Sequence, residues 1–197
     1  MKNKVVIIGC GNVGMSYAYA LLNRQTRVDE LVLIDRNKDR AIGEAMDLNH
    51  GLAFAESKIV IKAGSYSDCH DAAIICITAG AKQESGESRL DLLNKNSTIF
   101  KEIISNVALS KFKGIFLIVT NPVDIMTYLA YKYSGLSPDK VIGTGTTLDT
   151  ARLRYLIGDE LKLNIKNIHA YVMGEHGDSE FVSWSNAYIG SVPLTNF

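Results

Sequence analysis

Four polar residues, separated in the sequence, could together move a proton and hold a carboxylate. His176 lies in the glycine-flanked run 174–179, and histidine is the side chain whose charge changes nearest to neutral pH. Asp149 could orient the His176 ring and favour its imidazolium form. Arg152, on the same predicted helix as Asp149, could bind a carboxylate with two parallel hydrogen bonds. Arg89 ends a polar, glycine-containing stretch with the composition of a lid and could polarise a carbonyl oxygen when that lid closes.

Each of these residues also has an ordinary structural explanation. A histidine in a glycine turn can be a surface or capping residue, and an acid at a helix start, such as Asp149, complements the helix dipole. Arg152 and Arg89 could simply be solvated. A catalytic interpretation therefore depends on a second motif in the chain.

That motif lies near the N-terminus. The aliphatic run 5–8 is typical of a strand buried on both faces of a parallel sheet. Gly9, Gly11 and Gly14 follow it with a spacing that permits a tight turn, close approach of the backbone to a pyrophosphate, and close helix packing. Asp35 lies about 20 residues further on, where a carboxylate accepts hydrogen bonds from a ribose diol and repels a 2′-phosphate. The motif favours NAD over NADP, although the glycines could also serve packing alone in another α/β domain.

Strand-like and helix-like segments alternate along the chain, which predicts an α/β fold with a doubly wound, mostly parallel Rossmann sheet. Asn121 is expected to cap one helix, with Pro122 at its first position. The predicted strands are 5–8, 31–35, 59–61, 72–77, 114–119, 141–144 and 168–173. The predicted helices are one beginning at Val13, with Val13, Tyr17 and Leu21 on its apolar face, and those at 39–49, 90–108, 122–133 and 146–161.

Composition limits the classes of partner. Lys plus Arg and Asp plus Glu both total 21, so no net charge points to nucleic acid or a membrane. We find no signal peptide and no apolar run near the roughly 20 residues that span a bilayer. The three cysteines, Cys10, Cys69 and Cys76, have no metal-binding or C-x-x-C spacing, which favours a reducing cytoplasm and predicts no metal site. Cys10, inside the glycine turn, is expected to be a small filler.

Several stretches of the sequence are together typical of one enzyme family. They are Gly9–Gly14, Ala79–Ala81 with Gln83, Gly86–Leu92, Thr120–Asp124, Gly145–Arg152 and Gly174–Ser179. In these stretches the chain resembles the L-lactate/malate dehydrogenases, and within them the bacterial L-lactate dehydrogenases. The similarity runs from Val5 to about Trp184.

This resemblance implies a reversible hydride transfer between NADH and pyruvate that gives L-lactate and NAD. His176 would be the proton donor and acceptor, Asp149 its partner, Arg152 the carboxylate anchor and Arg89 the lid arginine. Asn121 would contact both substrate and cofactor. The NAD site implied by the resemblance comprises Gly9, Gly11, Val13, Gly14, Asp35, Arg40, Tyr66, Gly80, Ala81, Thr120, Asn121 and Thr144.

Gln83 bears on the choice of substrate. A malate enzyme needs a cation at this lid position for the second carboxylate of its substrate, whereas Gln83 is neutral, and Glu84 and Glu87 would repel a dianion. Lys82 is the nearby cation that could weaken this preference. We therefore expect pyruvate and lactate as substrates, with malate dehydrogenase activity as the alternative.

The resemblance also implies regulation and assembly. Arg154 and His169 match the positions at which bacterial lactate dehydrogenases bind fructose 1,6-bisphosphate across a subunit interface, although Arg154 could merely flank a helix and His169 could be packed in a strand. A cytoplasmic homotetramer that works in glycolysis and fermentation is expected on the same ground.

Members of the family continue well beyond Phe197. We expect residues 1–143 to form the NAD-binding domain and residues 144–197 to be the incomplete start of an α+β substrate domain. An alternative of another class is a truncated, catalytically weak or inactive NAD-binding module, because the catalytic histidine would lack part of the wall that excludes water.

Overall fold

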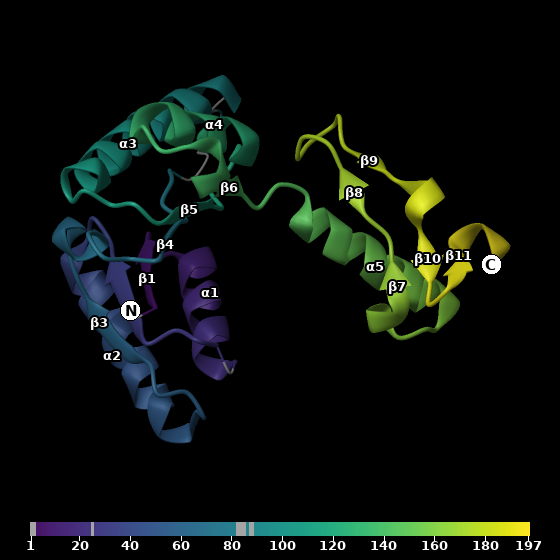
Figure 1. Ribbon diagram of the computed structural model, residues 1–197, viewed down its shortest axis with the longest axis horizontal. Coiled ribbons are helices and arrows are strands. Elements are labelled where there is room, and N and C mark those ends of the chain that lie inside the picture. Colours follow the sequence, from purple (N-terminus) through teal and green to yellow (C-terminus); the bar gives the residue numbers. More distant parts are fainter. Residues whose placement is uncertain (1–2, 25, 82–85, 87–88) are drawn as a thin grey trace. The chain divides into compact units, whose positions relative to one another are not determined.

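A computed structural model describes residues 3–24, 26–81, 86 and 89–197, with Arg89 and Leu90 described by their backbone alone. The chain forms two compact units, Met1–Gly143 and Thr144–Phe197, which follow one another along the colour scale of Figure 1. Among the described residues, no helix combines the length and the apolar character needed to cross a membrane.

The N-terminal unit contains a six-stranded parallel sheet in the order β3-β2-β1-β4-β5-β6. The doubly wound sheet predicted from the sequence is confirmed. Its strands are β1 (Lys4–Ile8), β2 (Glu30–Ile34), β3 (Val60–Ala63), β4 (Ile74–Ile77), β5 (Ile115–Ile118) and β6 (Val141–Gly143). Its helices are α1 (Asn12–Asn23), α2 (Lys38–Gly51), α3 (Arg89–Leu109) and α4 (Val123–Ser134), with short 3-10 turns at 52–54, 66–69 and 138–140.

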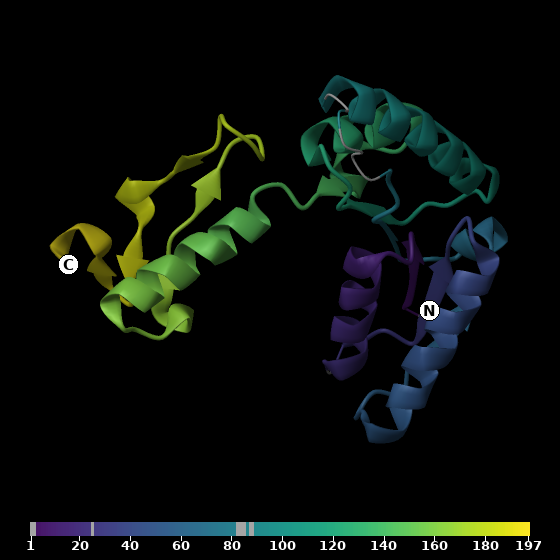
Figure 2. The same cartoon turned by 180° about the vertical axis from the view of Figure 1, so that it is seen from behind.

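The two faces of this sheet are covered by different helices. On one face, Ile7 of β1 packs in a buried cluster with Ala18 of α1 and Ala41 of α2. On the other face, Ile8 packs with residues of α3 and α4 that include Phe100 and Met126. Helices α3 and α4 lie side by side in both views (Figures 1 and 2). Because β1 pairs with both β2 and β4, the strand order reverses beside it, which is where such folds bind ligands.

The predicted apolar face of α1 is right in part, because Tyr17 and Leu21 pack against the core but Val13 does not. The helix buries Gly14, Ala18 and Leu22, whereas Val13 is 56% exposed. The reason is the close approach of the helix to the sheet: a Cβ atom at Gly14 would lie 2.1 Å from the carbonyl oxygen of Gly9. No side chain could be accommodated at position 14, and the centre of the buried face therefore runs through Gly14, Ala18 and Leu22.

The start of α4 also differs from the sequence prediction. Pro122 has an extended ψ of 115° and occupies the N-cap position, so the helix begins at Val123. Asn121 makes no capping hydrogen bond through its side chain, and the peptide bond between Asn121 and Pro122 is cis. Instead, the carbonyl of Pro122 accepts the first helical hydrogen bond, from the amide of Met126.

The C-terminal unit is a small α/β structure. It contains α5 (Thr147–Leu161), the strands β7 (Ile168–His169), β8 (Val172–Met173), β9 (Phe181–Val182), β10 (Tyr188–Ile189) and β11 (Val192–Pro193), and short 3-10 turns at 165–167, 184–186 and 194–196. The single strand predicted at 168–173 is therefore wrong. It divides because β7 pairs with β10 whereas β8 pairs with β9, so the two halves join different antiparallel sheets.

A buried lysine anchors a network of charges on the N-terminal unit. Lys4, at the start of β1, pairs with Asp71 and lies 4.0 Å from Glu30. Lys62 of β3 in turn lies 2.9 Å from both Glu30 and Asp68. The network thus ties three adjacent strands to the turn that follows β3.

Asp68 completes a capping box at the start of that turn, in which Ser65 is the N-cap residue. Its carboxylate accepts a 2.9 Å hydrogen bond from the Ser65 amide as well as pairing with Lys62. Burial opposes the charged form, but the Ser65 amide and the Lys62 ammonium outweigh it and lower the pKa of Asp68. The folded state therefore binds the Asp68 proton more weakly than the unfolded state does.

We predict that Asp68→Asn lowers the free energy of unfolding at pH 7 by about 1 kcal/mol, because asparagine keeps a capping oxygen but loses the charge. A carboxyl with a lowered pKa stabilises the fold above its unfolded value, near 3.8, and this contribution disappears as pH falls through the folded-state pKa. The difference between variant and parent, measured by urea unfolding, should shrink from pH 7 toward pH 3. Asp47→Asn on the exposed side of α2 is the control; a pH-independent deficit at Asp68 would contradict the electrostatic explanation.

Candidate active site

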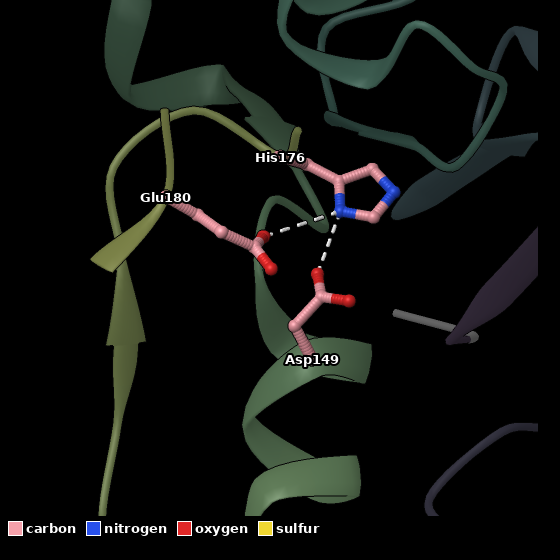
Figure 3. Close-up of side chains that lie close together, drawn as sticks. All are labelled: Asp149, His176 and Glu180. Carbon is pink, nitrogen blue, oxygen red and sulfur yellow. Dashed lines mark hydrogen bonds and ion pairs between the residues drawn. The ribbon is translucent and has the colours of Figure 1, made fainter. Parts of the chain in front are cut away.

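His176 and Asp149 are in direct contact. Nδ1 of His176 lies 2.6 Å from Oδ2 of Asp149, and Figure 3 shows the other ring nitrogen directed away from this carboxylate. Asp149 is buried in the first turn of α5, and the His176 side chain is 28% exposed. Since the hydrogen bond holds one edge of the ring, it presents the opposite nitrogen, Nε2, for proton transfer.

The local fold explains why these two side chains meet. Strands β8 and β9 form a hairpin, and His176 lies in its connecting loop, where Gly174 has a φ of +97° that favours glycine. The hydroxyl of Thr146 donates a 2.7 Å hydrogen bond to the carbonyl of Val172, and the Val172 amide donates a 3.0 Å bond to the Thr150 hydroxyl. The start of β8 is thus fixed against the first turn of α5, which carries Asp149.

Arg152 shares the Asp149 carboxylate with His176. Its Nη1 lies 3.1 Å from Oδ1, while the histidine contacts Oδ2. The Arg152 side chain is 63% exposed. Because a guanidinium carries five N–H donors in a planar fork, a group held by one of them can still bind an external carboxylate.

A second carboxylate near the ring was not singled out by sequence analysis. Oε2 of Glu180 lies 3.7 Å from Nδ1 of His176. Figure 3 shows the Glu180 carboxylate on the same side of the ring as Asp149. The signal available in the sequence was a glutamate four residues after the histidine, one residue beyond the stretch that carries the resemblance. The interacting atoms of Asp149, His176 and Glu180 lie within 4.8 Å of one another, which would suit a metal ion by distance alone. The short contact between His176 and Asp149 is a hydrogen bond, however, so we assign no metal here.

The glycine turn of the N-terminal unit has the geometry of a nucleotide cradle. Gly9 adopts φ +107°, and a Cβ atom there would lie 2.5 Å from the backbone nitrogen of Ala79. Gly11 is the N-cap of α1, which has no side-chain cap, and a Cβ atom at Gly11 would meet no described atom within 4 Å. Open space over uncapped helical N–H groups is what a pyrophosphate requires.

Asp35 directly follows β2 and helps to fix this turn. Its Oδ2 accepts a 2.8 Å hydrogen bond from the amide of Cys10, and Oδ1 accepts one of 2.9 Å from Asn37. A carboxylate has further lone pairs for ribose hydroxyls. Burial, with the nearby Asp35 charge, raises the pKa of the Cys10 thiol to about 12, and the side chain is fully buried, as is typical of a cysteine that fills space.

A buried asparagine, missed in the sequence, connects two loops at the carboxyl edge of the sheet. Asn96 of α3 accepts a 2.8 Å hydrogen bond from the Ala81 amide and donates one of 3.0 Å to the Asn121 carbonyl. The hydroxyl of Thr120 donates a 2.8 Å bond to the carbonyl of Ala79. Gly80, Ala81, Thr120 and Asn121 are thereby brought together. A polar residue on the apolar face of the predicted 90–108 helix was the available signal.

The other predicted cofactor residues are more dispersed. Arg40, on α2, pairs with Glu44 at 3.7 Å, and its charge lowers the pKa of the Cys10 thiol, against the larger upward effects of burial and of Asp35. Tyr66 is half-buried against the core, and burial with nearby acidic groups raises its pKa. Val13 is exposed at the start of α1, whereas Thr144 belongs to the C-terminal unit.

The roles predicted for Gln83 and Arg89 in the lid stay predictions. Gln83, with Lys82, Glu84 and Glu87, lies outside the described residues. Arg89 is the first residue of α3, and its side chain is not described.

Arg154 and His169 lie on adjoining elements of the C-terminal unit. Nε of Arg154 donates a 3.0 Å hydrogen bond to the carbonyl of Ala170, and its guanidinium carbon lies 4.7 Å from the centre of the Tyr171 ring. His169, on β7, is exposed. Both contacts hold Arg154 close to the strand that carries His169.

Comparisons with known proteins cover nearly the whole chain. Residues 3–143 match the family model for the lactate/malate dehydrogenase NAD binding domain, and residues 146–197 match that for the lactate/malate dehydrogenase alpha/beta C-terminal domain. The L-lactate dehydrogenase of Oceanobacillus iheyensis is 58% identical over 195 residues, which are 99% of this chain and 60% of that protein. The L-lactate dehydrogenase of Borrelia turicatae is 54% identical, over 100% of this chain and 62% of that protein.

Solved structures give the same result. A lactate dehydrogenase from a Medee basin deep-sea metagenome library, MGS-M5, matches with a TM-score of 0.95 and 55% identity, over 100% of this chain and 62% of that one. The chain therefore spans about 60% of the length of the curated relatives that it matches. Since the two family models together match residues 3–143 and 146–197, the chain belongs to the lactate/malate dehydrogenase family.

Proposed function

We propose that this protein is an NAD-dependent L-lactate dehydrogenase, which interconverts pyruvate and L-lactate. The observation that carries the proposal is the 2.6 Å contact between His176 and Asp149, with Arg152 bound to the other oxygen of the same carboxylate. The relatives support it, since those compared, at 53–58% identity, are named L-lactate dehydrogenase.

The N-terminal unit supplies the nucleotide site in this proposal. The uncapped start of α1 and the open space at Gly11 suit the pyrophosphate, and Asp35 suits the adenosine ribose. NAD, when bound, would accept or supply the hydride. Asn96 would keep the Ala81 and Asn121 loops in place beside it.

His176 would manage the proton. During reduction, its protonated ring donates from Nε2 to the carbonyl oxygen of pyruvate, which becomes the hydroxyl of lactate as the hydride reaches the carbon. In the reverse direction, the neutral ring takes the hydroxyl proton at the same nitrogen. Asp149 would hold the ring through its hydrogen bond and stabilise the charge that forms on it.

Arg152 would fix the substrate carboxylate. A two-pronged contact restrains the orientation of a small ketoacid and thus the face of its carbonyl that meets the hydride. The bond to Asp149 holds the guanidinium on the same side of α5 as the acid that positions the histidine.

Substrate preference rests on the sequence of the lid. Gln83 is neutral and is flanked by acids at positions 84 and 87, so a second substrate carboxylate would find repulsion there. Pyruvate is therefore preferred, and oxaloacetate is the alternative substrate.

Regulation and assembly are finer parts of the proposal. Arg154, held by the Ala170 carbonyl and the Tyr171 ring, and the exposed His169 would bind fructose 1,6-bisphosphate in a cytoplasmic homotetramer that works in glycolysis and fermentation. Both side chains are chemically suited to phosphate oxygens.

A second candidate function is a module that binds NADH without reducing a ketoacid efficiently. The observation that favours it is the exposure of Arg152 and His176, which are both partly open to water. NADH binding without reduction of either pyruvate or oxaloacetate would favour this module over the enzyme.

We predict that Asp149→Asn lowers the rate of pyruvate reduction by at least about 100-fold, because an amide neither fixes the ring as well nor stabilises its charge. NADH binding, followed by fluorescence, should change little. Asp159→Asn on the exposed side of α5 is the matched control and should keep parental activity. An active Asp149→Asn variant would remove the contact on which the proposal rests.

We predict that Gln83→Arg raises the kcat/KM ratio of oxaloacetate to pyruvate by at least about tenfold, since it adds a cation for the second carboxylate. Ser85→Arg places the same charge elsewhere in the lid and should change the ratio less. NADH oxidation with each ketoacid measures both variants. Equal effects at the two positions would mean that position 83 does not select the substrate.

A further inference from the structure

The Nδ1 edge of His176 faces two carboxylates that come from different elements. Asp149 projects from α5, and Glu180 lies at the end of the loop before β9 (Figure 3). Nδ1 lies 2.6 Å from Asp149 Oδ2 and 3.7 Å from Glu180 Oε2. Only the first distance is that of a hydrogen bond. Glu180 therefore acts on the ring through its charge.

The position of the Glu180 carboxylate beside the His176 ring is energetically unfavourable by itself. Its Oε2 is buried and has no hydrogen-bond partner among the described residues. It also lies close to a second acid, Asp149, and like charges repel. A buried acceptor without a donor is unfavourable unless something compensates for it. A positive charge on the His176 ring would compensate for both acids at once.

The other charged groups around this edge do not provide that compensation as directly. Arg152 neutralises part of the Asp149 charge through Oδ1, but its side chain is 63% exposed. Glu175 and Asp178, in the same loop as His176, are exposed and add negative charge. Within the C-terminal unit, the charged groups on α5 and on this loop that face or flank the ring are Asp149, Arg152, Glu175, Asp178 and Glu180.

We propose that Glu180 is a positioning residue, a second anionic partner that acts with Asp149 to favour the protonated form of His176. The inference rests on the proposed function, in which that form donates the proton to pyruvate. Two acids from two elements also confine the ring more narrowly than one, because rotation would move Nδ1 away from both.

Removal of the Glu180 charge should change the pH at which His176 loses its proton, and the direction of the change can be stated. Glu180→Gln keeps the shape of the side chain but not its charge, so the imidazolium should lose its proton at lower pH. For a partly exposed charge at this distance, we expect the titration midpoint of the ring to fall by about half to one pH unit. Asp178→Asn, the same charge change on an exposed residue of the same loop, is the matched control and should shift it much less.

The first measurement is NMR of the histidine rings against pH, with the His176 signal assigned from a His176→Gln variant. It needs no activity, so it applies even if the chain only binds NADH. Backbone amide spectra check that each variant is folded. If Glu180→Gln does not fold, Glu180→Asp, which keeps the charge but sets it further back, should shift the midpoint in the same direction by less. A shift in either Glu180 variant no larger than that of Asp178→Asn would overturn the inference.

The second measurement is the pH dependence of pyruvate reduction. The pH at which the rate falls on the alkaline side should move down in Glu180→Gln by the same amount as the NMR midpoint, with little change in the KM for pyruvate. A uniform loss of rate at all pH values would indicate a merely structural role and would overturn the inference. An NMR shift in a chain that reduces no ketoacid would instead refute the proposed function and leave the role of Glu180 intact.

Discussion

The carboxylate of Asp149 holds together the polar side chains of the C-terminal unit, because it contacts both His176 and Arg152. An acid buried at the start of a helix needs partners for both oxygens, and here each oxygen receives a different one. His176 approaches from a hairpin loop, and Arg152 approaches from the next turn of the same helix. The need to satisfy a buried carboxylate therefore also brings the His176 ring and the Arg152 guanidinium to the same group. Thr146 and Thr150 extend this arrangement, because their bonds to Val172 hold the hairpin that carries the histidine.

The N-terminal unit applies a similar constraint through close packing. Gly14 brings α1 against the turn at Gly9, and Gly9 brings that turn against Ala79 at the end of β4. Two neighbouring carboxyl ends of the sheet thus lie close enough that larger residues could not be accommodated. Asn96 joins two loops at the same edge through hydrogen bonds, since its side-chain amide accepts from the Ala81 amide and donates to the Asn121 carbonyl. Close packing and hydrogen bonds therefore act together at this edge of the sheet.

The sequence predicted those features that depend on local pattern. Buried strands, the glycine spacing and the acid after β2 are all local, and the doubly wound sheet follows from their order. The sequence predictions were wrong where tertiary packing determines the structure. The buried face of α1 is set by how closely Gly14 approaches Gly9, and the division of 168–173 is set by partner strands further along the chain. Asn96 was missed because its partners, Ala81 and Asn121, are distant in sequence. Glu180 was missed because only the folded loop brings it beside the His176 ring four residues earlier.

His176, Asp149 and Arg152 all come from α5 and one adjoining hairpin. The contacts that Asp149 makes with His176 and Arg152 therefore lie within residues 144–197. Under the proposed function, two causes of weak activity can be distinguished. Misplacement of the proton-transfer groups would disturb the contacts of Asp149, whereas poor exclusion of water would leave them intact and still weaken every electrostatic interaction with the substrate. Since Arg152 and His176 keep considerable exposure while their mutual partner is buried, enclosure of the substrate is the more demanding requirement of the two.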